Sequence, residues 1–508
     1  MCGIIGGVVA VAVGAVLTIV FNNLFQEVVL TDDTVQLERF ENVPVAITFN
    51  VRFFNISNSA EVLQGAMPVL TEIGPYVYRI NHSRIIDEVE EDTLTYRRLE
   101  RFQFVPEDSV GNSEDDYVTV ANIMYHVRSI INPYLLILLP HAILQVAEVT
   151  STPLMAAVNL ALNGVFGEYN SPILRVRVRD LLFDGITFCV NPNLISAQVC
   201  NQIRSSALSS NNIQIHDDGS MTFALFAFKN GVPSSNYKVL RGLTSSSDLG
   251  RIVEFDNSAR LFFWADNELL EGQTHSECNA LRGTDSAIFA PFVHPHTSLY
   301  AYNSDICRSV ELRYDEDVEY EGIPALRYTA KNWFLDNHEG CYCINETRGV
   351  TRYNGCLLEG AMELYSCVAF TVLTYPHFLY ADPVYRNGVV GLSPNEDQHR
   401  IMLDLEPHTG TIVRGAKRAQ FNIFLRPITS ISATQNLNTT LTPIFWVEET
   451  MSLPDTFVME LKSKLLSTLD LLNILLPILI AVSCLVLVVG IILTVIAKRN
   501  ANKVKDPK

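Results

Sequence analysis

Two long apolar runs without a charged side chain stand at opposite ends of this 508-residue chain, and they constrain its fold more than any other feature. The first occupies residues 2–21 and the second occupies residues 471–497. Each matches the roughly 20 residues that a helix needs to cross a bilayer. No Lys or Arg precedes the first run, which is also long for the apolar part of a signal peptide, so we expect an uncleaved anchor.

The residues that follow the second run set the expected orientation. Residues 498–508 carry five basic side chains and one acidic side chain, and basic segments beside a span stay in the cytoplasm. We therefore expect a cytoplasmic N-terminus and first helix over 1–25, an ectodomain over 26–470, a second helix over 471–497 and a cytoplasmic tail over 498–508. The spans hold no ionisable side chain, which argues against a pump or channel and assigns the function to the ectodomain.

The charge of the ectodomain argues against nucleic acid as a partner. The whole chain has a formal net charge of −18, and the basic tail makes the ectodomain more acidic still. Such a surface repels polyanions.

Cysteines and glycosylation sequons indicate an oxidising, lumenal or extracellular compartment. The four sequons begin at Asn55, Asn81, Asn345 and Asn438. Eight of the ten cysteines lie in the ectodomain, an even number that favours disulfides: Cys189, Cys200, Cys278, Cys307, Cys341, Cys343, Cys356 and Cys367.

The stretch CYC at 341–343 has three possible interpretations: a zinc knuckle, a redox pair or part of a disulfide framework. Its spacing matches neither a zinc pair nor a redox C-x-x-C. Two cysteines that flank one residue rarely bond each other, so each is expected to have a different partner. We expect no metal and no cofactor.

An apolar segment over 134–167 lies in the middle of the ectodomain. Pro140 and Pro153 divide it into pieces that are short for a span. A single extra crossing would also place Asn55 and Asn81 on the opposite side from the other sequons. The segment is either a buried helical bundle or an exposed apolar cluster that binds a lipid or a protein.

The rest of the ectodomain reads mainly as strands. Alternating β-branched and aromatic residues predict strands at 45–54, 222–228, 251–255 and 420–425. No repeat or linker marks a boundary, so we expect one large α+β unit.

Known enzyme motifs are absent, and we expect a receptor rather than an enzyme. The stretch DDGS at 217–220 could imitate the phosphate loop of an ectonucleotidase, but a turn is the commoner reading. The acidic run at 87–92 could bind calcium, but a solvated face is commoner.

Nine motifs, in this order and between two terminal spans, resemble those of the class B scavenger receptor family, which includes fatty acid translocase, lysosomal integral membrane protein and the insect sensory neuron membrane proteins. They are LQGA at 63–66, EIGPYVYR at 72–79, RDLLFDG at 179–185, CNALRGTD at 278–285, SDICRS at 304–309, PHFLYAD at 376–382, GLSPNE at 391–396, LEPHTG at 405–410 and AKR at 416–418.

The resemblance implies an antiparallel β-barrel-like core with an apical helical bundle over 134–167 and a hydrophobic tunnel that leads to the bilayer. Burying a methylene is favourable by about 0.8 kcal/mol, so an acyl chain would enter such a tunnel readily. We expect six apical residues near the lipid entrance: Leu135, Leu136, Leu138, Leu139, Ile143 and Leu144.

The resemblance also implies a disulfide pairing. It joins Cys278 with Cys341, Cys307 with Cys367, and Cys343 with Cys356. Cys189 and Cys200 are additional here and are expected to pair with each other. Cys2 resembles the acylated N-terminal cysteines of the family.

Two departures narrow the expected function. Residues 134–171 contain no Lys or Arg, which disfavours capture of anionic particles. We expect fatty acids, sterols, phospholipids or lipoprotein particles as ligands, or else a protein partner at the apex of a trafficking or adhesion receptor. The tail lacks an acidic dileucine or tyrosine-based sorting signal, which favours the plasma membrane over the lysosomal or endosomal membrane.

Overall fold

The computed structural model of the chain describes residues 28–126, 159, 161–207, 210–264, 277–336, 341–343, 349–364, 367, 371–428 and 431–504. Several predicted features lie outside the described residues: the first apolar run, Cys2, Asn345 and the six residues of the expected entrance.

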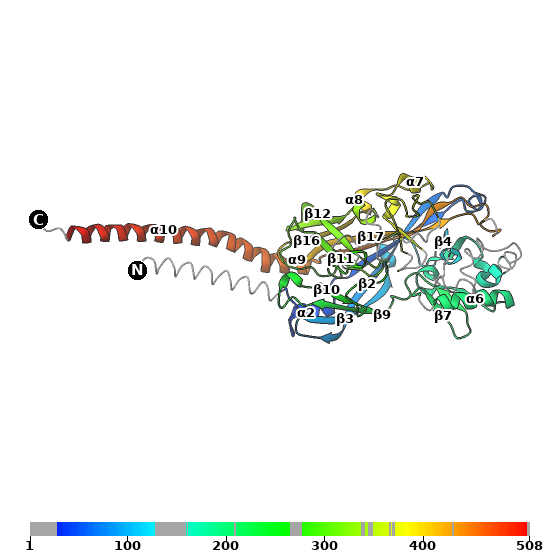
Figure 1. Cartoon of the computed structure of the whole chain (residues 1–508), viewed down its shortest axis with the longest axis horizontal. Coiled ribbons are helices and arrows are strands. Elements are labelled where there is room, and N and C mark those ends of the chain that lie inside the picture. Colours follow the sequence, from blue (N-terminus) through cyan, green and yellow to red (C-terminus); the bar gives the residue numbers. More distant parts are fainter. Residues whose placement is uncertain are drawn as a thin grey trace.

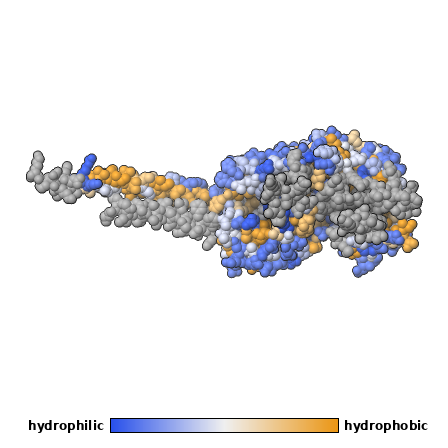
Figure 2. Space-filling view, viewed as in Figure 1, coloured by the Kyte–Doolittle hydropathy of each residue, from blue (hydrophilic) through white to orange (hydrophobic). Residues whose placement is uncertain are grey.

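A long apolar helix, α10 (Ser467–Val504), extends from one end of the body, as Figure 1 shows. Figure 2 shows apolar surface along it. Only 6% of its most apolar window is buried, and the mean hydropathy of that window is 3.1. At about 1.5 Å per residue, 38 residues exceed the roughly 30 Å hydrocarbon core of a bilayer. It contains the predicted second span and is, within the described ranges, the one helix suited to cross a membrane.

The body is built around one antiparallel sheet of 13 strands. Its order is β10-β9-β3-β2-β1-β18-β17-β16-β13-β12-β11, and β15 joins β14 to β17. The strands are β1 (Ile47–Ile56), β2 (Leu70–Val89), β3 (Thr93–Phe104), β9 (Pro233–Leu240), β10 (Ile252–Phe255), β11 (Leu299–Asn303), β12 (Arg308–Tyr320), β13 (Ile323–Ala330), β14 (Ala361–Glu363), β15 (Val372–Thr374), β16 (Ile401–Leu405), β17 (Ile412–Leu425) and β18 (Thr440–Ser452).

The pairing of the central strands shows which end of the body lies near α10. β1 pairs with β18, with Thr48 opposite Thr450 and Phe53 opposite Phe445. β18 runs into α9 (Asp455–Leu461), η10 (Lys462–Leu466) and then α10. The end of β1 near Thr48 is therefore close to α10, the candidate membrane helix, and the end near Ile56 is distant from it.

The sheet is open rather than a closed barrel, which corrects the expected core. In the described part of the chain no strand ladder joins the edge strands β10 and β11. A short irregular segment connects them instead. Ile252 N donates to Gly283 O, while Thr284 N donates to Tyr300 O and Thr284 O accepts from Tyr302 N.

The end of the body opposite α10 carries smaller elements (Figure 1). Two small sheets and a helix stand there: β4 (Tyr117–Ala121) with β5 (Ile173–Arg177), β6 (Ile186–Phe188) with β8 (Met221–Phe223) and β7 (Ile213–Ile215), and α6 (Leu194–Ala207). Of the expected apical segment 134–167, the structure describes residues 159 and 161–167. Residues 161–166 are helical.

The remaining described helices are short. They are α2 (Val35–Glu41), α3 (Ser59–Val62), α7 (Pro383–Arg386), α8 (Glu396–His399), η1 (Pro106–Asp108), η2 (Ile123–His126), η4 (Gly167–Tyr169), η5 (Asp180–Asp184), η6 (Ser246–Asp248), η7 (Glu277–Asn279), η8 (Asn332–Leu335) and η9 (Pro376–Phe378).

Three of the four predicted strands are confirmed as β1, β10 and β17. The fourth prediction, 222–228, is wrong beyond Phe223. The chain leaves the sheet there because Leu225 N and Phe226 N donate to the carbonyls of Leu181 and Leu182 in η5. A two-residue hairpin turn at Glu321 and Gly322 joins β12 to β13, and both residues have the positive φ that this kind of turn requires.

Four disulfides fasten the segments that have little regular structure. Cys278–Cys341 and Cys307–Cys367 connect the irregular chain around β11 to the stretch between β13 and β15, and Cys343–Cys356 closes a loop within that stretch. Cys189–Cys200 fastens α6 to β6. The first three are the pairs that the resemblance implied, and the fourth is the additional pair that we expected. CYC therefore joins two different partners.

Candidate functional site

The candidate site is the interior, which we define as the region where inward side chains of β2, β3 and β9 approach those of β11 and β17. Side chains from the two sides meet across it. Arg98 of β3 donates to Ser304 Oγ, just after β11, at 2.8 Å. The rings of Tyr237 (β9) and Tyr302 (β11) lie 6.2 Å apart.

Inward positions on β2 and β3 form successive levels because paired residues share a face of the sheet. From the apical end, the opposed pairs are Tyr78/Phe104, Ile80/Phe102, His82/Glu100, Arg84/Arg98 and Ile86/Tyr96. The interior therefore passes from aromatic to charged levels as it approaches the membrane end.

The more apical level is an aromatic layer with nine members: Phe49, Phe53, Tyr78, Phe102, Phe104, Phe183, Phe226, Phe421 and Phe445. Phe49 lies at its boundary with the next level, since it is opposite Glu449. Neighbouring ring centroids lie 4.9–6.5 Å apart, for example 4.9 Å between Phe421 and Phe445. Phe102, Phe104 and Phe421 are only partly buried although they face inward. The layer therefore retains apolar surface that a hydrocarbon could contact.

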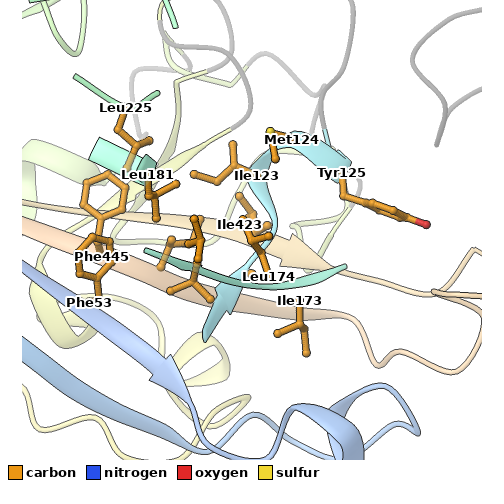
Figure 3. Close-up of a cluster of buried hydrophobic side chains, with 14 of the residues drawn as sticks. Phe53, Ile123, Met124, Tyr125, Ile173, Leu174, Leu181, Leu225, Ile423 and Phe445 are labelled. Atoms are coloured by element: carbon orange, nitrogen blue, oxygen red, sulfur yellow. The ribbon is translucent and has the colours of Figure 1, made fainter. Parts of the chain in front are cut away.

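A buried apolar cluster is continuous with the aromatic layer, and Figure 3 shows Phe53 and Phe445 of that layer as part of it. It unites Ile123, Met124 and Tyr125 of η2 with Leu174 of β5 and Ile423 of β17. Burial raises the pKa of Tyr125 to about 12.

The described residues that follow the expected entrance in the sequence belong to the same cluster. Leu162, Val165 and Phe166, the described C-terminal part of the expected apical segment, are each at most 3% exposed. This part of the segment is thus buried core. The two readings of residues 134–158 remain predictions.

The membrane-side level is a charged layer, defined by His82, Arg84, Arg98, Lys229, Asp285, Asp305, Lys417 and Glu449. Its centre is the pair Arg84–Asp285, with Nη2 to Oδ2 at 2.7 Å and both side chains 1% exposed. Tyr96 also donates to Asp285 at 2.8 Å. Burial raises the pKa of Asp285, but Arg84 lowers it more, so the pKa lies below its usual range and the carboxylate is ionised.

A second pair crosses the interior. Lys229 Nζ lies 2.6 Å from Asp305 Oδ2. Burial alone would lower the pKa of Lys229, but Asp305 and Glu100 raise it above its usual value, and the ammonium stays charged. Lys417 and Glu449 complete the layer at 3.4 Å. Sequence reasoning missed this layer. The available signal was the pair His82 and Arg84, which stand between Ile80 and Ile86 at every-second positions and therefore share one face of β2 with these apolar residues.

The opposite face of the sheet carries a separate polar cluster that holds residues 376–399 in place. The Nε2 atom of His377 lies 2.6 Å from Glu72 Oε2, which also accepts from Trp446 Nε1 at 3.0 Å. Burial raises the pKa of Glu72, but the bonds from His377 and Trp446 lower it below its usual value. His377 Nδ1 accepts from Ser393 N, and its ring stacks on His399 at 4.5 Å. With both nitrogens bonded, His377 serves as a structural link.

The two isolated acidic motifs are surface structure. Residues 216–220 form the turn between β7 and β8, with Ser220 N donating to Asp218 Oδ1 at 2.9 Å. In the acidic run, Asp87 pairs with Arg97 and Glu90 pairs with Lys238, both on the surface. Across the described ranges, no group of three or more His, Cys, Asp or Glu side chains is arranged to hold a metal.

Comparison with known proteins gives a consistent family. A family model described as the CD36 family matches residues 1–494. Sensory neuron membrane protein 2 of Drosophila melanogaster is 34% identical over 495 residues, which cover 88% of each chain. Its namesake in Aedes aegypti is 32% identical and covers 93% of this chain and 94% of the relative. Sensory neuron membrane protein 1 of Apis mellifera is 30% identical, with 86% and 79% covered.

Proposed function

Because this chain belongs to the CD36 family, the class B scavenger receptors, we propose that it binds lipids outside the cell and passes them through the interior toward the membrane. Its residence in the plasma membrane, with residues 26–470 outside, is part of the proposal. The relatives are named for sensory neuron membranes, and we propose the same setting here. The alternative is a receptor that holds a protein partner at its apex.

The observation that carries the proposal is the partly exposed aromatic layer. Apolar rings with accessible surface at inward positions offer a hydrocarbon a place away from water, worth about 25 cal/mol per Å² of apolar area buried. α10 follows β18 through α9 and η10, and β18 carries Phe445 of this layer. A route through the interior would thus end near the bilayer.

A plug inside the interior tests the proposal. Ala419 lies between Lys417 and Phe421 on the inward face of β17, opposite Val447, and both Ala419 and Val447 are only partly buried. We expect Ala419→Trp to reduce uptake of a fluorescent fatty acid by cells that express the full chain, with normal surface expression.

The matched control is Gln103→Trp, which places the same ring on the exposed outer face of β3. It should leave uptake unchanged. Normal uptake by a normally expressed Ala419→Trp protein would refute passage through the interior and favour the protein-binding alternative.

A further inference from the structure

Five polar atoms of the interior have no hydrogen-bond partner among the described residues: His82 Nε2, Arg84 Nε, Arg98 Nε, Tyr237 OH and Tyr302 OH. Arg84 is paired with Asp285 through its Nη2 atom, and the Tyr237 hydroxyl interacts with Ser304, which leaves His82, Arg98 and Tyr302. Tyr302 is 1% exposed and His82 is 9% exposed. An unsatisfied buried donor typically costs about 1–3 kcal/mol, so three of them in one region point to a partner that is missing.

The three groups belong to one neighbourhood. Arg98 lies over the ring of Tyr237 at 5.0 Å, and that ring is 6.2 Å from the ring of Tyr302. His82 sits beside Arg98 on the inward face of the β2–β3 pair, since His82 is opposite Glu100 and Arg84 is opposite Arg98. Burial, followed by Arg84 and Arg98, lowers the pKa of His82, so its ring is neutral and has one donor.

Arg98 also has no direct ionic partner in the described part of the chain. Arg84 is taken by Asp285, Lys229 by Asp305 and Lys417 by Glu449. The one side-chain hydrogen bond of Arg98 is to the neutral hydroxyl of Ser304. A buried guanidinium ordinarily binds a carboxylate or another strong acceptor.

The charged side chains of this neighbourhood are not completely covered. The side chains of Lys229 and Asp305 keep 17% and 35% of their accessible surface. Arg98 is also only partly buried. The polar end of a ligand could therefore reach these side chains.

We propose that His82, Arg98 and Tyr302 form a head-group site for an acyl lipid, in which they donate to the oxygen of its carboxylate or ester carbonyl while its hydrocarbon chain contacts the aromatic layer. This rests on the proposed function and adds a ligand class: the interior selects lipids with a hydrogen-bond-accepting oxygen over plain hydrocarbons. Binding alone is involved, and no bond of the ligand breaks.

The test uses three probes with the same chain and a diazirine at the chain end: a long-chain fatty acid, its methyl ester and the corresponding alkane. Each is photocrosslinked to the full-length protein in nanodiscs, and the labelled fraction is measured at equal concentration. The unsubstituted protein should label with the acid and the ester at least about ten-fold more than with the alkane.

Two substitutions remove donors in different ways. Tyr302→Phe deletes a hydroxyl that bonds none of the described residues, so the fold should be as stable as before. Labelling by the acid and the ester should drop about five-fold, while labelling by the alkane stays unchanged. Arg98→Met should lower labelling by the acid by about ten-fold or more. Tyr300→Phe, on the same strand and packed on Arg282, is the matched control and should change nothing.

Equal labelling by the acid and the alkane would overturn the proposal, and so would an unchanged acid-to-alkane ratio in Tyr302→Phe. Either result means that these donors bind ordered water only. Failure of all three probes to label the interior would instead refute the proposed function itself. The two failures are therefore distinguishable.

Discussion

The aromatic layer and the charged layer occupy neighbouring levels of one interior, yet different forces hold them. Phe49, Phe53 and Phe445 pack through ring contacts that have little directional demand. Arg84, Asp285 and Tyr96 meet through hydrogen bonds of 2.7–2.8 Å that need specific positions. Apolar contacts can be exchanged for those of a ligand at little cost, whereas ionic contacts of this kind cannot. The aromatic layer is thus suited to bind the hydrocarbon chain of a lipid, and the charged layer is suited to distinguish its polar head group.

The largest expected effect comes from removing one buried charge of the charged layer. Asp285→Asn keeps the volume of the side chain but leaves Arg84 charged and buried, and we expect it to lower the free energy of unfolding by about 3–5 kcal/mol. The matched control is Asp87→Asn, because Asp87 pairs with Arg97 on the surface and should cost at most about 1 kcal/mol. Thermal unfolding of the two purified proteins provides the measurement. Equal losses of unfolding free energy in the two variants would contradict the claim that buried ion pairs stabilise the charged layer.

The next largest expected effect is the loss of a disulfide, which differs between the charged layer and the apical end. Cys307 is two residues from Asp305 in the charged layer, whereas Cys189–Cys200 lies beside the apical sheets. Removing Cys307 and Cys367 together should cost about 2–5 kcal/mol and retain the protein inside the cell. Removing the additional pair, which closes a shorter loop, should cost less. Surface biotinylation of both double serine variants tests this ordering, which equal surface levels would refute.

Acid should act on the charged layer and spare the aromatic layer. The depressed pKa of His82 means that the unfolded chain takes up a proton below about pH 6.5 that the folded chain refuses. Stability should therefore be complete above pH 6.5 and fall by up to about 1.4 kcal/mol per pH unit below it. His399, whose pKa burial lowers to about 4, adds a similar loss outside the interior.

His82→Gln should remove part of this acid sensitivity, and adding His399→Gln should remove most of the remainder between pH 7 and 5. Melting temperatures across this range give the measurement. An unchanged slope in His82→Gln would show that His82 is accessible to protons in the folded protein.

The smallest expected effect is a difference in glycan occupancy, which tests which face of the sheet points toward the interior. Asn81 is exposed beside the inward His82, so we expect a glycan on it. Asn55 is partly buried, and its Oδ1 accepts from Thr119 N at 2.8 Å, so its occupancy should be much lower. Glycopeptide mass spectrometry compares the two sites. An unoccupied Asn81 with an occupied Asn55 would reverse the assignment of faces.

The sequence predicted features that depend on neighbouring residues, such as single strands and the apolar helix. It did not predict features that depend on contacts between residues far apart in the chain. Strand alternation located β1 and β17, and the apolar run at 471–497 located α10. The charged layer could not be predicted because Arg84 and Asp285 lie 201 positions apart and meet only through the register of the whole sheet. The open edge between β10 and β11 was also hidden, since it depends on single hydrogen bonds of residues 283 and 284.

The central claim, that an acyl chain lies in the interior against the aromatic layer, has one direct test. A fatty acid with a diazirine at its chain end is photocrosslinked to the full-length protein in cells, and the labelled peptides are mapped by mass spectrometry. We expect the label on peptides of β17 and β18 that contain Phe421 and Phe445, and we expect Ala419→Trp to abolish it. Label confined to α10, where bilayer lipid alone reaches the protein, would contradict the claim.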